Sequence, residues 1–157
     1  MIVTDEAILR LPCSDASLEE AKVIIEQLER ELKLSAERGQ EGIGLAAPQI
    51  NIQKRVAIVR IPTNNSGILS VNLVNCKIAT GYDQAIFEQE GCLSFPGKSE
   101  KTLRYQEIHV VNNLVAPHSF IATGLMAVAI QHELNHLDNI LLPDLAIKKY
   151  LTHNKSL

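Results

Sequence analysis

The sequence predicts an α+β fold in which antiparallel β-sheets surround a central buried metal-binding helix, with an N-terminal helix packed outside. Two helical patterns, one near each end, enclose a middle region of short β-rich segments. Because the predicted strands follow one another without intervening helices, they favour antiparallel sheets over a parallel doubly wound sheet. The 157 residues, 46% of them hydrophobic, suit a single domain covering residues 1–157.

The first helix is expected at residues 18–37, where apolar side chains recur at helical spacing. Ser17 and Glu20 have capping-box spacing at its start, and Gly39 suits its end. We expect this helix to cover the core. Strands are then predicted at residues 55–61, 68–78, 85–88, 108–111 and 119–121, with a turn at 64–67.

A second long helix is predicted at residues 124–138, where apolar side chains occur all round the helix axis. Such a helix is expected to be buried in the middle of the domain. Asn139 can adopt the left-handed conformation that ends a helix, and Pro143 prevents the helix from resuming.

Composition narrows the classes of partner. With 15 Lys and Arg against 18 Asp and Glu, and no block of like charge, we expect neither nucleic acid nor a membrane surface as a partner. The first residues lack the pattern of a secretory signal, and no apolar run approaches a membrane span. Three cysteines, an odd number, fit a reducing compartment. We therefore expect a cytoplasmic monomer that binds small molecules or neutral peptides.

The most informative segment is residues 131–136, which contains His132, Glu133 and His136. On a helix, histidines four residues apart lie on one face and can share a metal ion. Glu133 projects about 100° away from His132, so it can transfer protons beside the metal without binding it. The pattern predicts chemistry by metal-activated water.

Two histidines leave the metal short of ligands, so a carboxylate or a cysteine must supply the third. Cys92 follows a predicted strand and lies between glycines that permit close approach. It could complete a Cys–His–His set with a fourth position open for water, as in catalytic metal sites. Glu133 could then take a proton from the water and deliver it to a leaving amine. This chemistry is amide hydrolysis.

Hydrolysis of an amide also needs donors for the negative charge that develops on the carbonyl oxygen. Two groups are candidates: the side-chain amide of Gln49, behind a loop of small residues, and the backbone N–H of Leu93. They lie far apart in the sequence, so their convergence is a hypothesis.

Three segments, residues 42–49, 90–94 and 131–136, together resemble the ordered signature motifs of the peptide deformylases. That family removes the N-formyl group from the initiator methionine of nascent bacterial and organellar proteins. The resemblance implies the following roles: metal ligands Cys92, His132 and His136; general acid and base Glu133; oxyanion donors Gln49 and Leu93 N–H; and pairing with the substrate backbone by Gly44. It also implies Fe²⁺ as the native metal, with Zn²⁺ or Ni²⁺ in purified samples, which agrees with a mixed N/S ligand set.

A methionine substrate needs an apolar slot near the metal. Leu125, Val128 and Ala129 lie on the His132 side of the helix, and Ile43 could form the opposite wall. The small side chain of Ala129 would leave room for an unbranched substrate side chain.

The chain departs from the family pattern at several places. Asn135 and Asn139 stand where the family usually has Asp and Gly, and Arg104 could donate to Asn135 in a neutral-acceptor hydrogen bond. Lys98 stands near the place of an arginine that helps many members to hold the substrate. Only 14 residues follow Pro143, so we expect a compact variant, phage- or organelle-type, whose transient association with the ribosome is doubtful.

Three other interpretations compete with the deformylase. The two histidines could be ordinary core residues, but the matching motifs around Cys92 and Gln49 disfavour this. A small HExxH metallopeptidase would share the helix motif and cleave internal peptide bonds. A metal-stabilised binding module without catalysis predicts that Glu133→Gln leaves all function intact.

Overall fold

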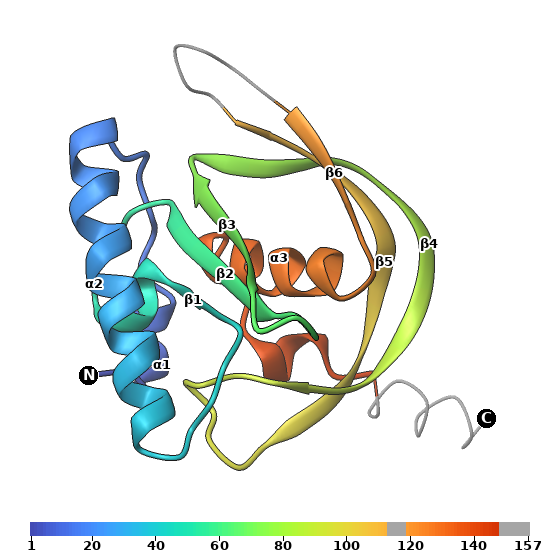
Figure 1. Cartoon of the computed structure of the whole chain (residues 1–157), viewed down its shortest axis with the longest axis horizontal. Helices are drawn as coiled ribbons and strands as arrows, with labels where there is room; N and C mark the ends of the chain where they lie inside the picture. Colours follow the sequence, from blue (N-terminus) through green and yellow to red (C-terminus); the bar gives the residue numbers. More distant parts are fainter. Residues whose placement is uncertain (113–118, 148–157) are drawn as a thin grey trace.

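The computed structural model describes residues 1–112 and 119–147. One long helix, α3, lies between two antiparallel sheets, and a second long helix, α2, lies on the outside of the first sheet (Figure 1). This arrangement confirms the predicted fold class. The elements in chain order are α1 (Glu6–Leu9), α2 (Leu18–Glu37), β1 (Gly44–Ala46), the 3₁₀ helix η1 (Ala47–Ile50), β2 (Val56–Pro62), β3 (Ile68–Val74), β4 (Cys76–Gly91), β5 (Ser99–Asn112), β6 (Ser119–Thr123), α3 (Gly124–Leu137) and the 3₁₀ helix η2 (Leu142–Leu145).

Each sheet has three strands in sequence order, β1-β2-β3 and β4-β5-β6, and every pairing is antiparallel. Strand β2 is buried on both faces because it separates two apolar cores. Ala57 and Val59 pack in the core that contains α3, whereas Val56 and Ile58 pack in the core beneath α2. The period of two along a strand therefore places α2 and α3 on opposite faces of one sheet.

The predicted bounds of α2 are confirmed at Leu18 and Glu37. Ser17 Oγ accepts from the backbone N–H of Glu20, while the Glu20 carboxylate accepts from the N–H of Ser17. This reciprocal capping box satisfies N–H groups at the helix start that have no partner within the helix. Gly39 has a φ of +84°, the left-handed conformation that suits the chain just beyond a helix.

The predicted strand at residues 68–78 is wrong in one respect, because it is two strands separated by Asn75. This residue has a φ of +54°, and its side chain bonds both the N–H and the carbonyl of Ala16. The strands expected at 85–88 and 108–111 are short parts of the long β4–β5 hairpin. Sequence patterning missed their full length because many of the additional positions carry polar side chains that face solvent.

Helix α3 ends as predicted. Asn139 has a φ of +61°, and Arg55 donates to the carbonyl of Leu137 and to the Asp138 carboxylate. Pro143 lies in the first turn of η2. Most of the apolar side chains of α3 are buried, but Leu125 is 46% exposed, contrary to burial all round the axis, because it borders an open pocket.

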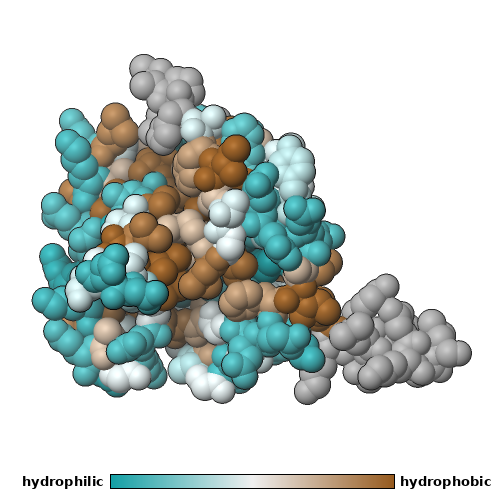
Figure 2. All heavy atoms as spheres, turned by 45° about the vertical axis from the view of Figure 1, so that its right-hand side comes forward, coloured by the Kyte–Doolittle hydropathy of each residue, from teal (hydrophilic) through white to brown (hydrophobic). Residues whose placement is uncertain are grey.

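Apolar side chains also reach the surface. Large ones on the strands that are about half exposed or more include Ile68, Leu69, Ile86, Leu103 and Ile121. Figure 2 shows apolar side chains gathered in the middle of one face, with hydrophilic side chains around them. Within the described residues, no helix has both the length and the apolar character needed to cross a membrane.

Candidate metal centre

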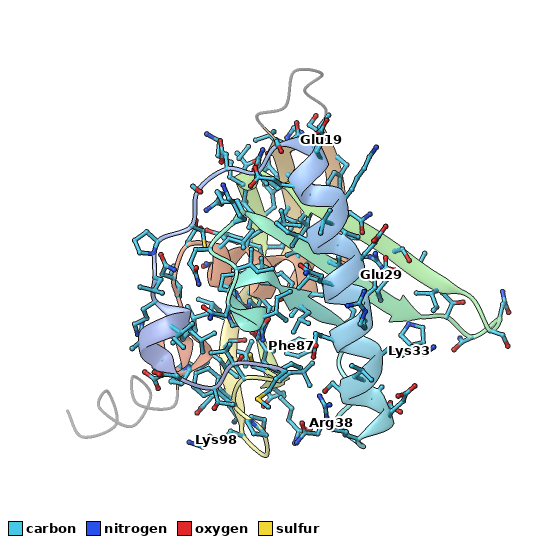
Figure 3. The ribbon with its side chains drawn as sticks, turned by 90° about the vertical axis from the view of Figure 1, so that its left-hand side faces the viewer. Glu19, Glu29, Lys33, Arg38, Phe87 and Lys98 are labelled. Carbon is cyan, nitrogen blue, oxygen red and sulfur yellow. The ribbon has the colours of Figure 1, made fainter. Side chains whose placement is uncertain are left out.

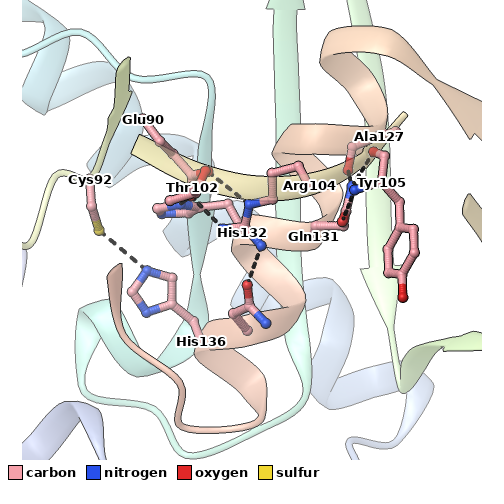
Figure 4. Close-up of polar contacts among 10 residues, drawn as sticks. Glu90, Cys92, Thr102, Arg104, Tyr105, Ala127, Gln131, His132 and His136 are labelled. Carbon is pink, nitrogen blue, oxygen red and sulfur yellow. Dashed lines mark hydrogen bonds and ion pairs between the residues drawn. The ribbon is translucent and has the colours of Figure 1, made fainter. Parts of the chain in front are cut away.

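Three side chains that are distant in sequence meet between α3 and the end of β4. Cys92 follows the last residue of β4, while His132 and His136 lie one turn apart on α3. Their ligand atoms all lie within 4.8 Å of one another, and Cys92 Sγ is 3.3 Å from His136 Nε2 (Figure 4). The structure therefore brings together the thiol and the two imidazoles that the sequence analysis selected.

The chemistry of this cluster fits a divalent metal ion. One thiolate and two imidazoles form a set of N/S donors that suits borderline metals such as Fe²⁺, Ni²⁺ and Zn²⁺. Burial and the charge of His132 hold the pKa of His136 well below its usual value, so its ring is neutral, as a metal ligand must be. Glu133 Oε1 is buried and has no hydrogen-bond partner among the described residues, so it is free to bond water or substrate at the centre.

Glu90 orients the first histidine. Its Oε2 lies 2.7 Å from His132 Nδ1, so Nε2 of that ring is left for the metal. Burial would raise the pKa of Glu90, but hydrogen bonds from Arg104 and His132 outweigh burial and lower it to about 2. Burial likewise opposes charge on His132, yet the Glu133 charge and the bonds with Cys92 and Glu90 raise its pKa to about 10, so a metal ion that binds this ring must displace a proton. A carboxylate behind a ligating histidine fixes the ring and increases its basicity.

Sequence reasoning gave Glu90 no role, although it stands two residues before Cys92. The role of Glu90 becomes visible only in the folded chain, because strand β4 pairs with β5 and brings Glu90 beside Thr102 and Arg104. Thr102 Oγ1 donates to Glu90 Oε1 at 2.7 Å, and Arg104 donates to both carboxylate oxygens. No spacing along the chain predicts that convergence.

Polar side chains also join α3 to β5. Gln131 accepts from the N–H of Tyr105 at 2.9 Å and donates to its carbonyl at 2.8 Å, as a neighbouring strand would. One turn later, Asn135 accepts from Arg104 Nη1 at 2.5 Å. We call Gln131, Asn135, Arg104 and Tyr105 the polar seam. The predicted contact between Arg104 and Asn135 is therefore present.

Glu133 lies on the other side of α3, against β1. A Cβ atom on Gly44 would come within 2.5 Å of Glu133 Oε2, so only glycine leaves space for this carboxylate. Burial is the main cause that raises the pKa of Glu133, to about 7. A carboxyl group that titrates near neutrality can both accept and release a proton at physiological pH.

Gln49 approaches the centre from η1. Its side-chain oxygen accepts from the N–H of Ala46, which leaves Nε2 to donate to Ser94 Oγ at 3.1 Å and to approach Cys92 Sγ at 3.6 Å. The Gln49 amide is thus aimed at the metal centre. Leu93 lies in the same pocket wall, with its side chain against Gly42.

A pocket of about 520 Å³ opens beside the donor cluster. All five residues expected around the substrate lie in its wall: Ile43, Gly44, Leu125, Val128 and Ala129. Lys98, which stands near the place of the substrate-holding arginine of the family, lies there too, as does Phe87, to which the sequence analysis gave no role. Figure 3 places Phe87 within the body of the molecule, and Lys98 and Arg38 towards its lower edge.

The fold and the donor set define a class: an α+β protein in which a central HExxH helix and one cysteine form a candidate metal site beside a pocket. The chain belongs to the polypeptide deformylase family, whose model matches residues 1–150.

Individual relatives agree with that assignment. The peptide deformylase of Heliobacterium modesticaldum is 42% identical over 105 residues, and the match covers 66% of this chain and 66% of the relative, just under two thirds of its length. The crystal structure of a probable peptide deformylase from synechococcus phage S-SSM7 has a TM-score of 0.80 and 32% identity, over 92% of this chain and 98% of that one. A class I type b peptide deformylase from Acinetobacter baumannii, with Met-Ala-Ser bound, has a TM-score of 0.74 and 28% identity, covering 92% and 96%.

Proposed function

We propose that the protein is a peptide deformylase, which converts an N-formylmethionyl peptide and water to formate and a peptide with a free N-terminal methionine. The observation that carries this proposal is the convergence of Cys92, His132 and His136 with the buried Glu133 beside one pocket. Membership of the polypeptide deformylase family supports it. The Acinetobacter baumannii relative was crystallised with Met-Ala-Ser, a peptide of the kind that deformylation releases.

Cys92, His132 and His136 would hold one divalent metal ion, with Fe²⁺ as the native ion and Zn²⁺ or Ni²⁺ as replacements in a purified sample. When bound, such an ion supplies Lewis acidity, which makes water a better nucleophile and polarises a carbonyl group. Glu90, which contacts His132 Nδ1, would orient this ring so that Nε2 binds the ion.

Glu133 would move the protons. It takes one from the attacking water while the water oxygen bonds to the formyl carbon, and it delivers that proton to the amine nitrogen as the C–N bond breaks. Its buried carboxylate, with a pKa raised to about 7, is matched to both steps. The second water proton stays with the formate that leaves as formic acid and ionises in solution.

The remaining residues would bind and orient the substrate. The Gln49 amide, already aimed at the centre, and the Leu93 N–H would donate to the oxygen on which charge develops. β1 is the end strand of its sheet, and its outer edge at Gly44 would pair with the substrate backbone. The side chains of Ile43, Leu125, Val128 and Ala129 would enclose the methionine side chain.

The proposal includes the setting of the enzyme. We infer a cytoplasmic monomer, composed of one domain, that acts on nascent peptides and binds neither nucleic acid nor membranes. The expectation of at most transient ribosome association depends on the end of the chain, of which residues 148–157 lie outside the described residues.

The test is an anaerobic assay of formate release from formyl-Met-Ala, with metal analysis of the same sample. Release of one formate per substrate, together with intact Met-Ala, supports a deformylase. Cleavage of the Met–Ala bond without formate release would identify a metallopeptidase instead. The matched control is acetyl-Met-Ala, which keeps the amide but replaces the formyl hydrogen with a methyl group.

A further inference from the structure

We propose that Asn135 is a positioning residue that sets how tightly the metal centre holds its ion. It acts through Arg104 and Glu90 on the ligand His132. The inference rests on the proposed function insofar as it takes Cys92, His132 and His136 to be metal ligands.

A continuous line of contacts joins Asn135 to His132. Asn135 Oδ1 accepts from Arg104 Nη1, the other nitrogens of that guanidinium donate to Glu90, and Glu90 Oε2 bonds His132 Nδ1 at 2.7 Å. The side chains of Arg104 and Glu90 are both 5% exposed, so water screens their charges only weakly. A change of charge at residue 135 is therefore transmitted to the imidazole.

The charges along this line define the role of Asn135. Within the described part of the chain, Glu90 is the carboxylate that pairs with Arg104, and Asn135 offers that arginine a neutral oxygen. The whole guanidinium charge therefore offsets Glu90, which limits the electron density that Glu90 directs to His132. A carboxylate at residue 135 would share the arginine and leave Glu90 more negative, so the opposite His132 nitrogen would become a stronger ligand.

Docking of the helix depends on Gln131 as well as on Asn135. Gln131 makes two hydrogen bonds with the Tyr105 backbone and donates to the carbonyl of Ala127. A replacement of Asn135 that keeps the hydrogen bond to Arg104 should thus leave α3 in place. For this reason, an experiment can separate the effect of the charge at residue 135 from the effect of moving helix α3.

The key variant is Asn135→Asp, which keeps the shape and the acceptor but adds a charge. We expect it to bind Zn²⁺ about 10-fold more tightly than the unchanged protein, as measured by competition with a chelator. Asn135→Ala, which removes the acceptor without adding charge, should bind Zn²⁺ more weakly because Arg104 and Glu90 are less firmly held. Gln106→Glu is the matched control: it adds the same charge at an exposed position of β5 and should leave the Kd within about twofold.

The absorption spectrum of the Co²⁺-loaded protein provides a second measurement that a purely structural role would not move. In Asn135→Asp we expect the visible bands to shift in energy while their intensity stays that of a four-coordinate site. Unchanged or weaker Zn²⁺ binding by Asn135→Asp, or an equal gain in Gln106→Glu, overturns the proposal. Loss of the four-coordinate bands in Asn135→Asp overturns it too, because the variant would then have changed geometry.

Failure of the proposed function has a different signature. If the unchanged protein binds Zn²⁺ and Co²⁺ but releases no formate from formyl-Met-Ala, the deformylase assignment fails and the Asn135 inference stands. If the unchanged protein binds neither metal ion, the inference falls as well.

Discussion

The two sides of helix α3 differ in how they treat polar groups. On the side facing β5, the polar groups of α3 have hydrogen-bond partners on the strands. Gln131 and Asn135 bond residues of β5, and His132 Nδ1 contacts Glu90 of β4. On the side facing β1, Glu133 packs against the small Gly44, and its Oε1 has no partner among the described residues. One side is saturated with polar contacts, and the other keeps a buried carboxylate unbonded.

Because of this difference, one side of α3 can hold the helix in a fixed position while the other, reactive side leaves a carboxylate available for the proposed reaction. The saturated side fixes the position of the proposed ligand His132, because Glu90 contacts its Nδ1 and is itself held by Thr102 and Arg104. The unsaturated side is destabilising by itself, since a buried carboxylate without a partner is costly. In the proposed reaction this unbonded carboxylate is what allows Glu133 to exchange a proton with water and substrate.

Replacement of Glu133 by glutamine should give the largest effect on the reactive side. Glutamine keeps the shape but cannot accept a proton, so we expect kcat for formyl-Met-Ala to fall by about 10²–10⁴-fold. The Zn²⁺ content should stay that of the unchanged protein, because Glu133 is not among the three ligating groups. Activity that survives intact would favour a metal-stabilised binding module, in which this carboxylate has no catalytic task.

Gly44→Ala tests whether Glu133 needs the space that the missing side chain of Gly44 leaves for its carboxylate. The added methyl group would lie within 2.5 Å of Glu133 Oε2 and must displace it. We expect kcat/KM to fall by about 10²-fold, since small misplacements of a catalytic group are costly. Gly91→Ala is the control, as its nearest atom would be 3.8 Å away. Equal losses in the two variants would argue against the specific contact with Glu133.

The contribution of Glu90, on the saturated side, to the stability of the fold can be measured by lowering the pH. The pKa of Glu90 is about 2 in the folded protein against an ordinary value of 4.5, so it stabilises the fold above about pH 4.5 and loses that contribution as the pH falls towards 2. The loss amounts to about 3 kcal/mol in the metal-free protein. Urea denaturation at pH 5, 4 and 3 measures it.

Two variants at neighbouring glutamates isolate that contribution. Glu90→Gln should lower stability at pH 5 and flatten the acid dependence, because the titrating group is gone. Glu88→Gln removes a 70% exposed carboxylate paired with Lys101 and should change neither. A steep acid dependence that persists in Glu90→Gln would show that the loss arises elsewhere.

The same contrast explains what could be read from the sequence. His132, Glu133 and His136 carry their chemistry in residue type and spacing, so the helical part of the site was predictable. Cys92 was one candidate for the third ligand, and the family resemblance selected it. The fold class followed from the order of the helical and β-rich segments. The contact between Arg104 and Asn135 was anticipated from the family resemblance. Glu90 and the contacts of Gln131 with Tyr105 were hidden, because their partners come together only through the β4–β5 pairing and the packing of α3 on β5. The break at Asn75 was likewise hidden, since it depends on hydrogen bonds to Ala16, 59 residues earlier.

The smallest effect is expected at Ala129, a buried residue in the pocket wall on the reactive side. Ala129→Phe would fill part of the slot proposed for methionine. We expect KM for formyl-Met-Ala to rise about 10-fold, with kcat changed less, and the preference to move towards formyl-Ala-Ala. Ala36→Phe, at an exposed position of α2, should leave both constants unchanged. If Ala129→Phe leaves KM for the methionine substrate unchanged, the methionine side chain binds elsewhere, and the reactive side of α3 serves the proton transfer alone.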